Sequence, residues 1–110
     1  MIVPGLRISF DALLARTARL PDVELVAPPR VLGKNTRECL QSGIVHGYAS
    51  LVEGLLAKLK LELGFVCHVF ATGGLATVIA PLVPGVDVID PDLTLRGLEL
   101  IWQRSRVQQK

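Results

Sequence analysis

The chain has 110 residues, half of them hydrophobic and 20% charged, with a formal net charge of +2. This length favours a single domain, and the hydrophobic content argues against a disordered chain. Lysines and arginines are scattered without a basic stripe of interleaved aromatic residues, so we expect no nucleic-acid partner.

The first predicted element is a short helix. Ser9 can cap its first turn, and Pro21 ends it after Leu20 because proline cannot continue a helix. Four residues fall on one face of this helix: Phe10, Leu13, Leu14 and Thr17. Prolines and a glycine then predict a loop up to Lys34, with a short extended piece at residues 23–26.

The longest predicted element is a helix that covers residues 35–63. Asn35 can cap it, Glu38 has the spacing of a capping box, and Gly64 is a natural C-cap. A strip of small residues runs along it, formed by Gly43, Gly47, Ser50 and Gly54. Each interior glycine costs up to about 1 kcal/mol, so close packing must compensate. The partner is either the same helix of a second subunit or another element of this chain.

A glycine turn follows the next predicted element, a buried strand at residues 69–72. The turn is Thr72-Gly73-Gly74, and a short helix over residues 75–82 comes directly after it. Glycines at this junction let a ligand approach the backbone, and a helix start suits an anion. A tight turn without any ligand is the alternative.

The last third of the chain predicts a short strand at residues 86–90 and a final helix. That helix has an apolar side expected to be buried, formed by Leu95, Leu98, Ile101 and Trp102. The polar tail from Gln103 is expected to fray. Two short strands make a poor sheet, so we expect the other strands of the domain to precede Met1.

Other features argue for a soluble protein without metal chemistry of its own. The uncharged stretch between Leu63 and Val86 could cross a bilayer, but its glycines and prolines favour strand, turn and helix, so no membrane partner is expected. Cys39 and Cys67 are expected to be buried thiols in a reducing compartment, with a disulfide as the alternative. His46 and His68 lack partners at metal or triad spacing and are given structural roles.

Five segments stand in order along the chain, between Pro4 and Trp102. They are Pro4-Gly5-Leu6-x-Ile8-Ser9, Thr17-Ala18-x-Leu20-Pro21, Gly33-Lys34-Asn35-Thr36, Ala71-Thr72-Gly73-Gly74-Leu75-Ala76 and Asp90-Pro91-x-Leu93-Thr94-Leu95. Together they resemble the second domain of type III pantothenate kinases. The resemblance implies an α/β fold: the ribonuclease-H-like second domain of the actin-like ATPases, here incomplete, helix-rich and with a truncated sheet.

The resemblance also implies an activity and its partners. Such kinases transfer the γ-phosphoryl group of ATP to pantothenate, giving 4'-phosphopantothenate in the first step of coenzyme A biosynthesis. They are cytoplasmic homodimers that use Mg²⁺ and a monovalent cation, K⁺ or NH₄⁺. We expect the homodimer to form through the helix of residues 35–64.

Site residues follow from the same motifs. Thr36 matches a pantothenate-contacting threonine, although a second helix cap beside Asn35 is the alternative. Thr72, Gly73 and Gly74 match the turn that holds the adenosine end of ATP. Lys34 could face phosphate, but an exposed loop lysine is the preferred interpretation.

Two motifs of the family are not in these 110 residues: the Asp-x-Gly-Asn-Thr phosphate loop and the Gly-x-Asp-Arg segment with the catalytic aspartate. Residues 1–110 are therefore expected to be a C-terminal portion that lacks the N-terminal, ATP-phosphate-binding and catalytic part and is inactive alone. No catalytic residue and no metal ligand is assigned, because the five aspartates stand in other contexts: Asp11, Asp22, Asp87, Asp90 and Asp92.

Two other functions were weighed against the kinase hypothesis. One is a non-catalytic dimerisation or interaction module derived from the kinase, which the small-residue strip would serve. The other is a dinucleotide-binding domain, which is disfavoured because Gly73-Gly74 lacks the third glycine of that fingerprint.

Overall fold

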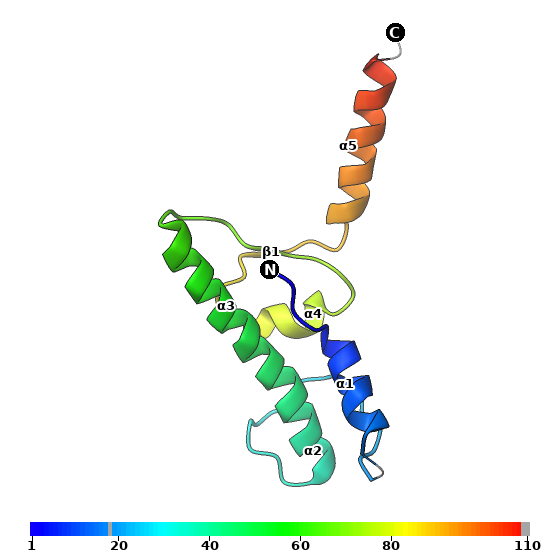
Figure 1. Ribbon diagram of the computed structural model, residues 1–110, viewed down its shortest axis with the longest axis vertical. Coiled ribbons are helices and arrows are strands. Elements are labelled where there is room, and N and C mark those ends of the chain that lie inside the picture. Colours follow the sequence, from blue (N-terminus) through cyan, green and yellow to red (C-terminus); the bar gives the residue numbers. More distant parts are fainter. Residues whose placement is uncertain (18, 109–110) are drawn as a thin grey trace.

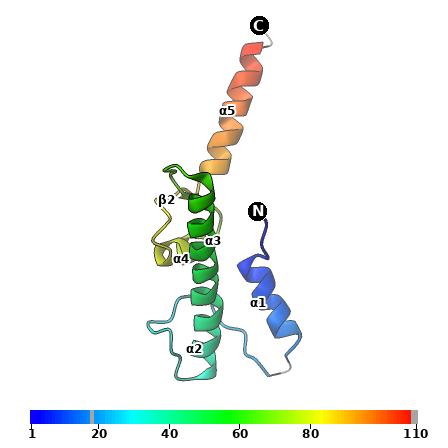
Figure 2. The ribbon, with the colours of Figure 1, turned by 60° about the vertical axis from the view of Figure 1, so that its left-hand side comes forward.

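The computed structural model describes residues 1–17 and 19–108. They form a helical body from which helix α5, Leu93–Gln108, projects (Figures 1 and 2). The radius of gyration is 18.0 Å and the extents are 63 × 32 × 23 Å. A compact domain of this length has a radius of gyration of about 13 Å. The excess reflects the projecting helix.

Helix α1 covers Leu6–Ala15 and begins one turn before the predicted cap. Gly5 is its N-cap, and the Gly5 carbonyl accepts the Ser9 N–H at 2.9 Å, so Ser9 lies inside the helix. The prediction of Ser9 as the cap is wrong because the earlier start lets Leu6 join Phe10 on one buried face, four residues apart.

The predicted end of this helix is also wrong, since α1 stops at Ala15 and not at Leu20. The Thr17 hydroxyl donates to a backbone carbonyl oxygen one turn earlier, at 2.7 Å, which satisfies an acceptor at the helix end. Ala18, within the predicted span, lies outside the described residues. The loop that follows is as predicted, and its extended piece buries two alternating side chains, Val23 and Leu25.

The predicted long helix is present as three consecutive segments. They are α2 (Thr36–Gln41), the π-helical turn η1 (Ser42–His46) and α3 (Gly47–Leu63). The predicted N-cap is confirmed, because the Asn35 side-chain oxygen accepts the Glu38 N–H at 2.9 Å. The predicted C-cap is confirmed as well, because Gly64 adopts a left-handed conformation with φ of 68°.

The π turn was not predicted, and it coincides with the anchoring of the preceding loop. The Gln41 amide donates to the Glu24 carbonyl oxygen at 2.9 Å, and the Ser42 hydroxyl donates to the Val31 carbonyl oxygen. His46 lies with Nε2 3.3 Å from the Pro28 carbonyl oxygen, which fits the structural role expected for it. Such wide turns interrupt a helix where side chains or loops impose other contacts.

The only sheet among the described residues has two short parallel strands, β1 (Phe70–Ala71) and β2 (Val88–Ile89). The connection between them contains α4 (Ala76–Ile79) and the single 3₁₀ turn η2 (Ala80–Leu82). Together these elements form a βαβ unit, as the predicted α/β pattern requires. The two strands and the helix between them are confirmed, with strands shorter than predicted.

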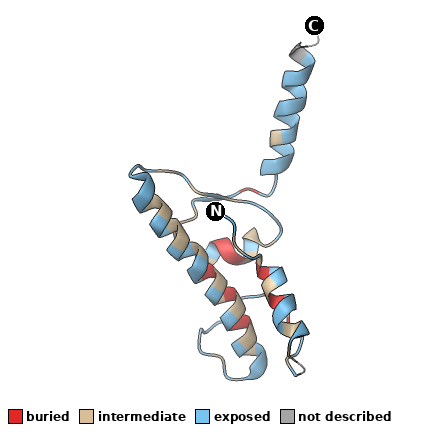
Figure 3. Cartoon of the chain, viewed as in Figure 1, coloured by how far each residue is buried: buried red, intermediate tan, exposed pale blue. Residues whose placement is uncertain are grey.

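The core lies where α1, the long helix and α4 meet, as the red segments in Figure 3 show. Its buried side chains are Leu6, Phe10, Val23, Leu25, Val45, Ala49, Ile79 and Val83. This cluster joins the N-terminal helix to the βαβ unit across the middle of the long helix. It therefore fixes the position of the turn that follows β1.

Helix α5 differs most from the prediction. It continues to Gln108, so the expected fraying from Gln103 is wrong for the described residues. Its predicted buried side is also wrong: the side chains are 55–66% exposed, namely Leu95, Leu98, Ile101 and Trp102. Arg106 stacks over the Trp102 ring at 4.1 Å from the centroid. Helical periodicity identified the apolar side correctly, but nothing in the body covers it.

Two further predictions concern the cysteines and the uncharged stretch between Leu63 and Val86. Cys39 is exposed, so the expectation that both thiols are buried is wrong, while Cys67 is half-buried, and both are free. Cys39 lies on α2, most of whose residues are exposed or half-buried. None of the described helices is long and apolar enough to cross a membrane.

Gly33 should be the least replaceable glycine of the body. A Cβ atom at this position would lie 2.5 Å from the Cys39 backbone nitrogen, a contact that only backbone movement can relieve. We expect Gly33→Ala to lower the free energy of unfolding by about 1–3 kcal/mol, measured by urea titration. Gly97→Ala is the control, because a Cβ there meets nothing within 4 Å; an equal effect of both changes would contradict the prediction.

Candidate functional site

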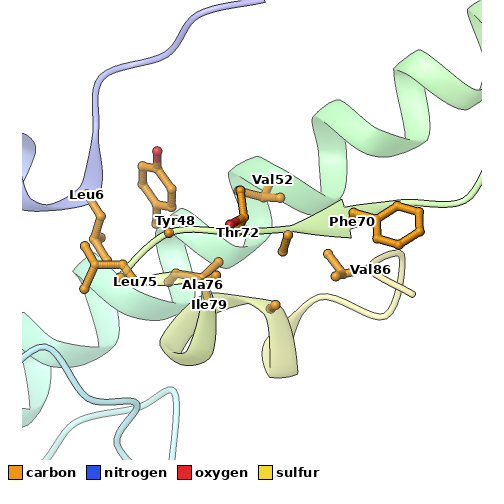
Figure 4. Close-up of a pocket in the computed structure, with 13 residues that line it drawn as sticks. Leu6, Tyr48, Val52, Phe70, Thr72, Leu75, Ala76, Ile79 and Val86 are labelled. Atoms are coloured by element: carbon orange, nitrogen blue, oxygen red, sulfur yellow. The ribbon is translucent and has the colours of Figure 1, made fainter. Parts of the chain in front are cut away.

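A pocket of about 620 Å³ opens between the long helix and the βαβ unit. Tyr48 and Val52, one turn apart on α3, contribute one side, and Phe70 and Val86 contribute from β1 and the approach to β2 (Figure 4). Ile79 of α4 reaches the pocket from the core. The pocket is therefore built by the same packing that joins the long helix to α4.

The Thr72-Gly73-Gly74 turn lies in the wall of this pocket, directly after the carboxyl end of β1. Gly73 has φ of 100°, a conformation that side chains with a Cβ rarely adopt. A Cβ at Gly74 would meet nothing within 4 Å, so bare backbone borders open space there. In open α/β sheets, ligands bind in the crevice outside the carboxyl ends of the strands.

The chemistry of the pocket suits a largely apolar group held by a few polar contacts. Most of its walls are aliphatic or aromatic, and the Tyr48 hydroxyl is already used, donating to the Pro4 carbonyl oxygen at 3.2 Å. The Thr72 hydroxyl and the turn backbone supply polar groups. Helix α4 has only four residues, so its start gives no basis for an anion site.

Thr36 does not share this pocket. It is the exposed first residue of α2, twelve positions before Tyr48 in the same run of helical segments. At 1.5 Å per residue, that separation is about 18 Å along the axis. The cap of α2 is Asn35. The structure thus brings Thr72, Gly73 and Gly74 together and leaves Thr36 apart from them.

Lys34 is an exposed loop lysine, as preferred from the sequence. Its backbone N–H donates to the Glu38 carboxylate at 2.8 Å, a variation on the predicted capping box.

Asp90 is a residue whose importance the sequence did not reveal. It directly follows β2, is 6% exposed, and its N–H donates to the Ala71 carbonyl oxygen at 2.8 Å. Its carboxylate pairs with Arg96 and accepts the Asp92 N–H at 3.1 Å. Asp90 therefore links the end of the sheet to α5. Its position just after a predicted strand was the available signal.

The described residues offer no cluster of ligands for a metal ion. Within the part of the chain that the structure describes, no three His, Cys, Asp or Glu residues gather so that they could hold a metal ion. The carboxylate of Asp90 is taken up by Arg96 and the backbone. The residues of the pocket itself carry no carboxylate.

Comparison with known proteins identifies the family of the chain. The sequence model of the family described as type III pantothenate kinase matches residues 1–58. The chain belongs to this family. It is 55% identical over 103 residues to the type III pantothenate kinase of Thermomicrobium roseum, a match that covers 94% of this chain and 40% of that protein.

Further relatives agree with this family assignment. The type III pantothenate kinase of Moorella thermoacetica is 50% identical over 104 residues, which are 94% of this chain and 41% of the relative. That of Roseiflexus sp. is 51% identical over 105 residues, 96% of this chain and 41% of the relative. The chain thus spans about two fifths of the length of these pantothenate kinases. The resemblance stated from the five sequence segments is confirmed.

The two glycines of the turn should respond differently to alanine. Gly73→Ala forces a Cβ into the left-handed region, and we expect it to lower the free energy of unfolding by about 1–3 kcal/mol. Gly74→Ala, with an ordinary φ and open space around it, should change stability by less than about 0.5 kcal/mol. Urea unfolding of both variants measures the difference, and similar values would refute the role assigned to Gly73.

Proposed function

We propose that this chain supplies the adenosine-binding side of a pantothenate kinase, which transfers the γ-phosphoryl group of ATP to the hydroxyl of pantothenate and forms 4'-phosphopantothenate, in the cytoplasm. One observation carries the proposal: the Thr72-Gly73-Gly74 turn, at the carboxyl end of β1, borders an apolar pocket of about 620 Å³. Membership of the family supplies the reaction, and the pocket supplies a place for the nucleotide.

The pocket can hold the adenosine end of ATP by two kinds of contact. Aromatic and aliphatic walls, among them Tyr48 and Val52, offer the faces on which a purine packs. The Thr72 hydroxyl can donate or accept a hydrogen bond, and the backbone of Gly73 and Gly74 can be approached closely. The phosphates then extend away from the apolar walls.

We assign the substrate pantothenate to the start of the long helix, away from the pocket. Thr36 stands exposed at the start of α2, with its hydroxyl free of the capping role that Asn35 fulfils. A hydroxyl at this place can hydrogen-bond the polar pantothenate. Lys34 is near enough in sequence to add a positive charge to the same region.

We also propose that residues 1–110 alone do not complete the reaction. Phosphoryl transfer requires positioned phosphates, a metal ion and a group that orients the acceptor. The Mg²⁺ and the K⁺ or NH₄⁺ ion implied by the resemblance find no fitting ligand set among the described residues, so we derive no step through either ion. The fold proposed for the whole is the actin-like one, which the βαβ unit with its ligand-facing turn supports.

ATP binding without turnover is the expected behaviour of the purified chain. In an NMR titration, ATP should shift the backbone amides of residues 72–76 more than those of α1. Ala76→Leu fills the pocket and should weaken ATP binding at least about tenfold, because the added side chain occupies the space of the base. With ATP, Mg²⁺, K⁺ and pantothenate together, no 4'-phosphopantothenate should form above background.

Thr77→Leu is the matched control, since it adds a similar side chain to the neighbouring, exposed position of α4, outside the pocket lining. Equal weakening by both variants, or no shifts at residues 72–76, would refute the nucleotide site. Turnover by the chain alone would refute only the proposal that these residues are insufficient.

We further propose a homodimer through the long helix. Cβ atoms built at Gly43, Gly47 and Gly54 meet nothing within 4 Å, so none of the described residues packs closely on these three glycines. The exposed row continues beyond the predicted strip, in the spacing 4-3-4-3-4 that is typical of paired helices: Gly43, Gly47, Ser50, Gly54, Ala57 and Leu61. A second copy of the helix fits such a row because small side chains permit close approach.

Gly47→Leu should abolish this dimer, because a large side chain at the centre of the row holds two helices apart. Size-exclusion chromatography with light scattering should give a dimer mass for the unmodified chain and a monomer mass for the variant. Ala12→Leu places the same side chain on an exposed position of α1 and should leave the dimer intact. A monomeric unmodified chain would refute the homodimer.

A further inference from the structure

Strand β1 is held against β2 by an aspartate at each of its ends. It has only two residues, Phe70 and Ala71, and a two-stranded sheet is marginal by itself. At the amino end, the Val69 N–H donates to the Asp87 carboxylate at 2.7 Å, and the Val69 carbonyl oxygen accepts the Asp87 N–H at 2.9 Å. At the carboxyl end, the Ala71 carbonyl oxygen accepts the Asp90 N–H at 2.8 Å.

The two aspartates differ in burial and in what their carboxylates bind. Asp87 is exposed, whereas Asp90 is buried. One carboxylate oxygen of Asp90 accepts the Asp92 N–H at 3.1 Å, and the other pairs with the Arg96 guanidinium of α5. A buried carboxylate is costly unless charged and hydrogen-bonded partners replace the water that it loses. Arg96 is therefore the partner that holds the Asp90 carboxylate, and with it the Asp90 backbone, at the end of β2.

The backbone bond of Asp90 is made next to the turn that borders the pocket. Ala71 accepts this bond, and Thr72 and Gly73 follow it directly in the chain. On its other side, the turn is closed by the Ala76 N–H, which donates to the Gly73 carbonyl oxygen at 3.1 Å. Gly73 has φ of 100° and, as a glycine, has many other conformations open to it. The conformation of the turn thus depends on how firmly its two ends are held.

We propose that the ion pair of Asp90 and Arg96 is a positioning element of the nucleotide site: it holds the end of β1 so that the Thr72-Gly73-Gly74 turn presents its backbone to the adenosine end of ATP. The proposal rests on the nucleotide site of the proposed function and adds two residues that lie outside the pocket lining. Both residues act through Ala71 and not by contact with the ligand. Loss of the pair lets the turn adopt other conformations, and ATP binding then has to pay for restoring the present one.

A purely structural role of the same pair predicts another pattern. If Asp90 and Arg96 only attach α5, their replacement changes the stability of the chain but not the turn of those molecules that remain folded. A positioning role changes the turn and the affinity for ATP in the folded chain. The two roles are therefore distinguished by measurements on variants that circular dichroism shows to be fully folded.

Asp90→Asn is the first test, because it keeps the size of the side chain and the backbone N–H but removes the charge that pairs with Arg96. Asp87→Asn is the matched control, since it makes the same change at the opposite end of β1. Isothermal titration calorimetry measures the dissociation constant for ATP. We expect Asp90→Asn to weaken ATP binding at least about fivefold and Asp87→Asn to change it less than about twofold, because hydrogen bonds to charged groups are the stronger ones.

Arg96→Gln is the second test, and it leaves Asp90 itself unchanged. Without ATP, native-state hydrogen exchange should show the Asp90 amide exchanging at least about tenfold faster, with the amides of α3 unaffected, because the opening is local. Arg104→Gln, at an exposed position of the same helix, is the control and should change neither exchange nor ATP affinity. Arg96→Lys keeps the positive charge and should recover most of the affinity that Arg96→Gln loses.

The double variant Asp90→Asn with Arg96→Gln tests whether the two residues act as one unit. Its loss of ATP affinity should not exceed that of the weaker-binding single variant, since the second change removes a partner that is already lost. Losses that multiply would contradict the proposal. So would equal effects of Asp90→Asn and Asp87→Asn, or an exchange rate that rises uniformly along the chain.

Failure of this proposal can be separated from failure of the proposed function. If the unmodified chain binds ATP and the variants bind as their controls do, the positioning role is refuted and the nucleotide site stands. If the unmodified chain binds no ATP while Arg96→Gln opens the Asp90 amide locally, the nucleotide site is refuted and the pair still positions the turn.

Discussion

The rest of the structure depends on one packing contact, the burial of Val45 and Ala49 of the long helix against α1 and the segment after β1. Val45 is fully buried, and Phe10 and Val83 beside it in the same cluster are 0% and 2% exposed. Burying side chains of this size stabilises the fold by about 1.5–3 kcal/mol each. No other cluster of the described residues joins the N-terminal half to the βαβ unit, so the pocket wall formed by Tyr48 and Val52 depends on it.

Local signals in the sequence predicted the elements whose ends are set locally. The Asn35 cap, the Gly64 C-cap and the Thr72-Gly73-Gly74 turn were all recognised, because each requires a particular residue type at one backbone position. The start of α1 was missed because the burial of Leu6 decides it, not a side-chain cap. The exposure of Cys39 was missed for a related reason, since it depends on which elements reach α2.

The candidate site was predictable only in part. A glycine pair after a strand indicated where a ligand could approach the backbone, but not which side chains would face it. Tyr48 and Val52 are twenty or more residues from the turn in sequence, and only the fold brings them to the same pocket. Likewise Asp90 shared its residue type with four other aspartates, and its pairing with Arg96 emerges only when β2 and α5 are placed. Periodicity found the apolar side of α5 but could not say what covers it.

The π turn at Ser42–His46 changes the rotation of the helix after it relative to the helix before it. A wide turn accommodates one residue more than an α-helical turn, so every side chain after His46 is rotated by about 100° relative to an uninterrupted helix. Thr36, before this turn, and Tyr48, after it, therefore keep an angular relation that a regular helix of the same length would not give them. One extra residue in the π turn thus sets the directions in which the side chains of α2 and α3 point. The loop that Gln41 and Ser42 anchor lies against this turn.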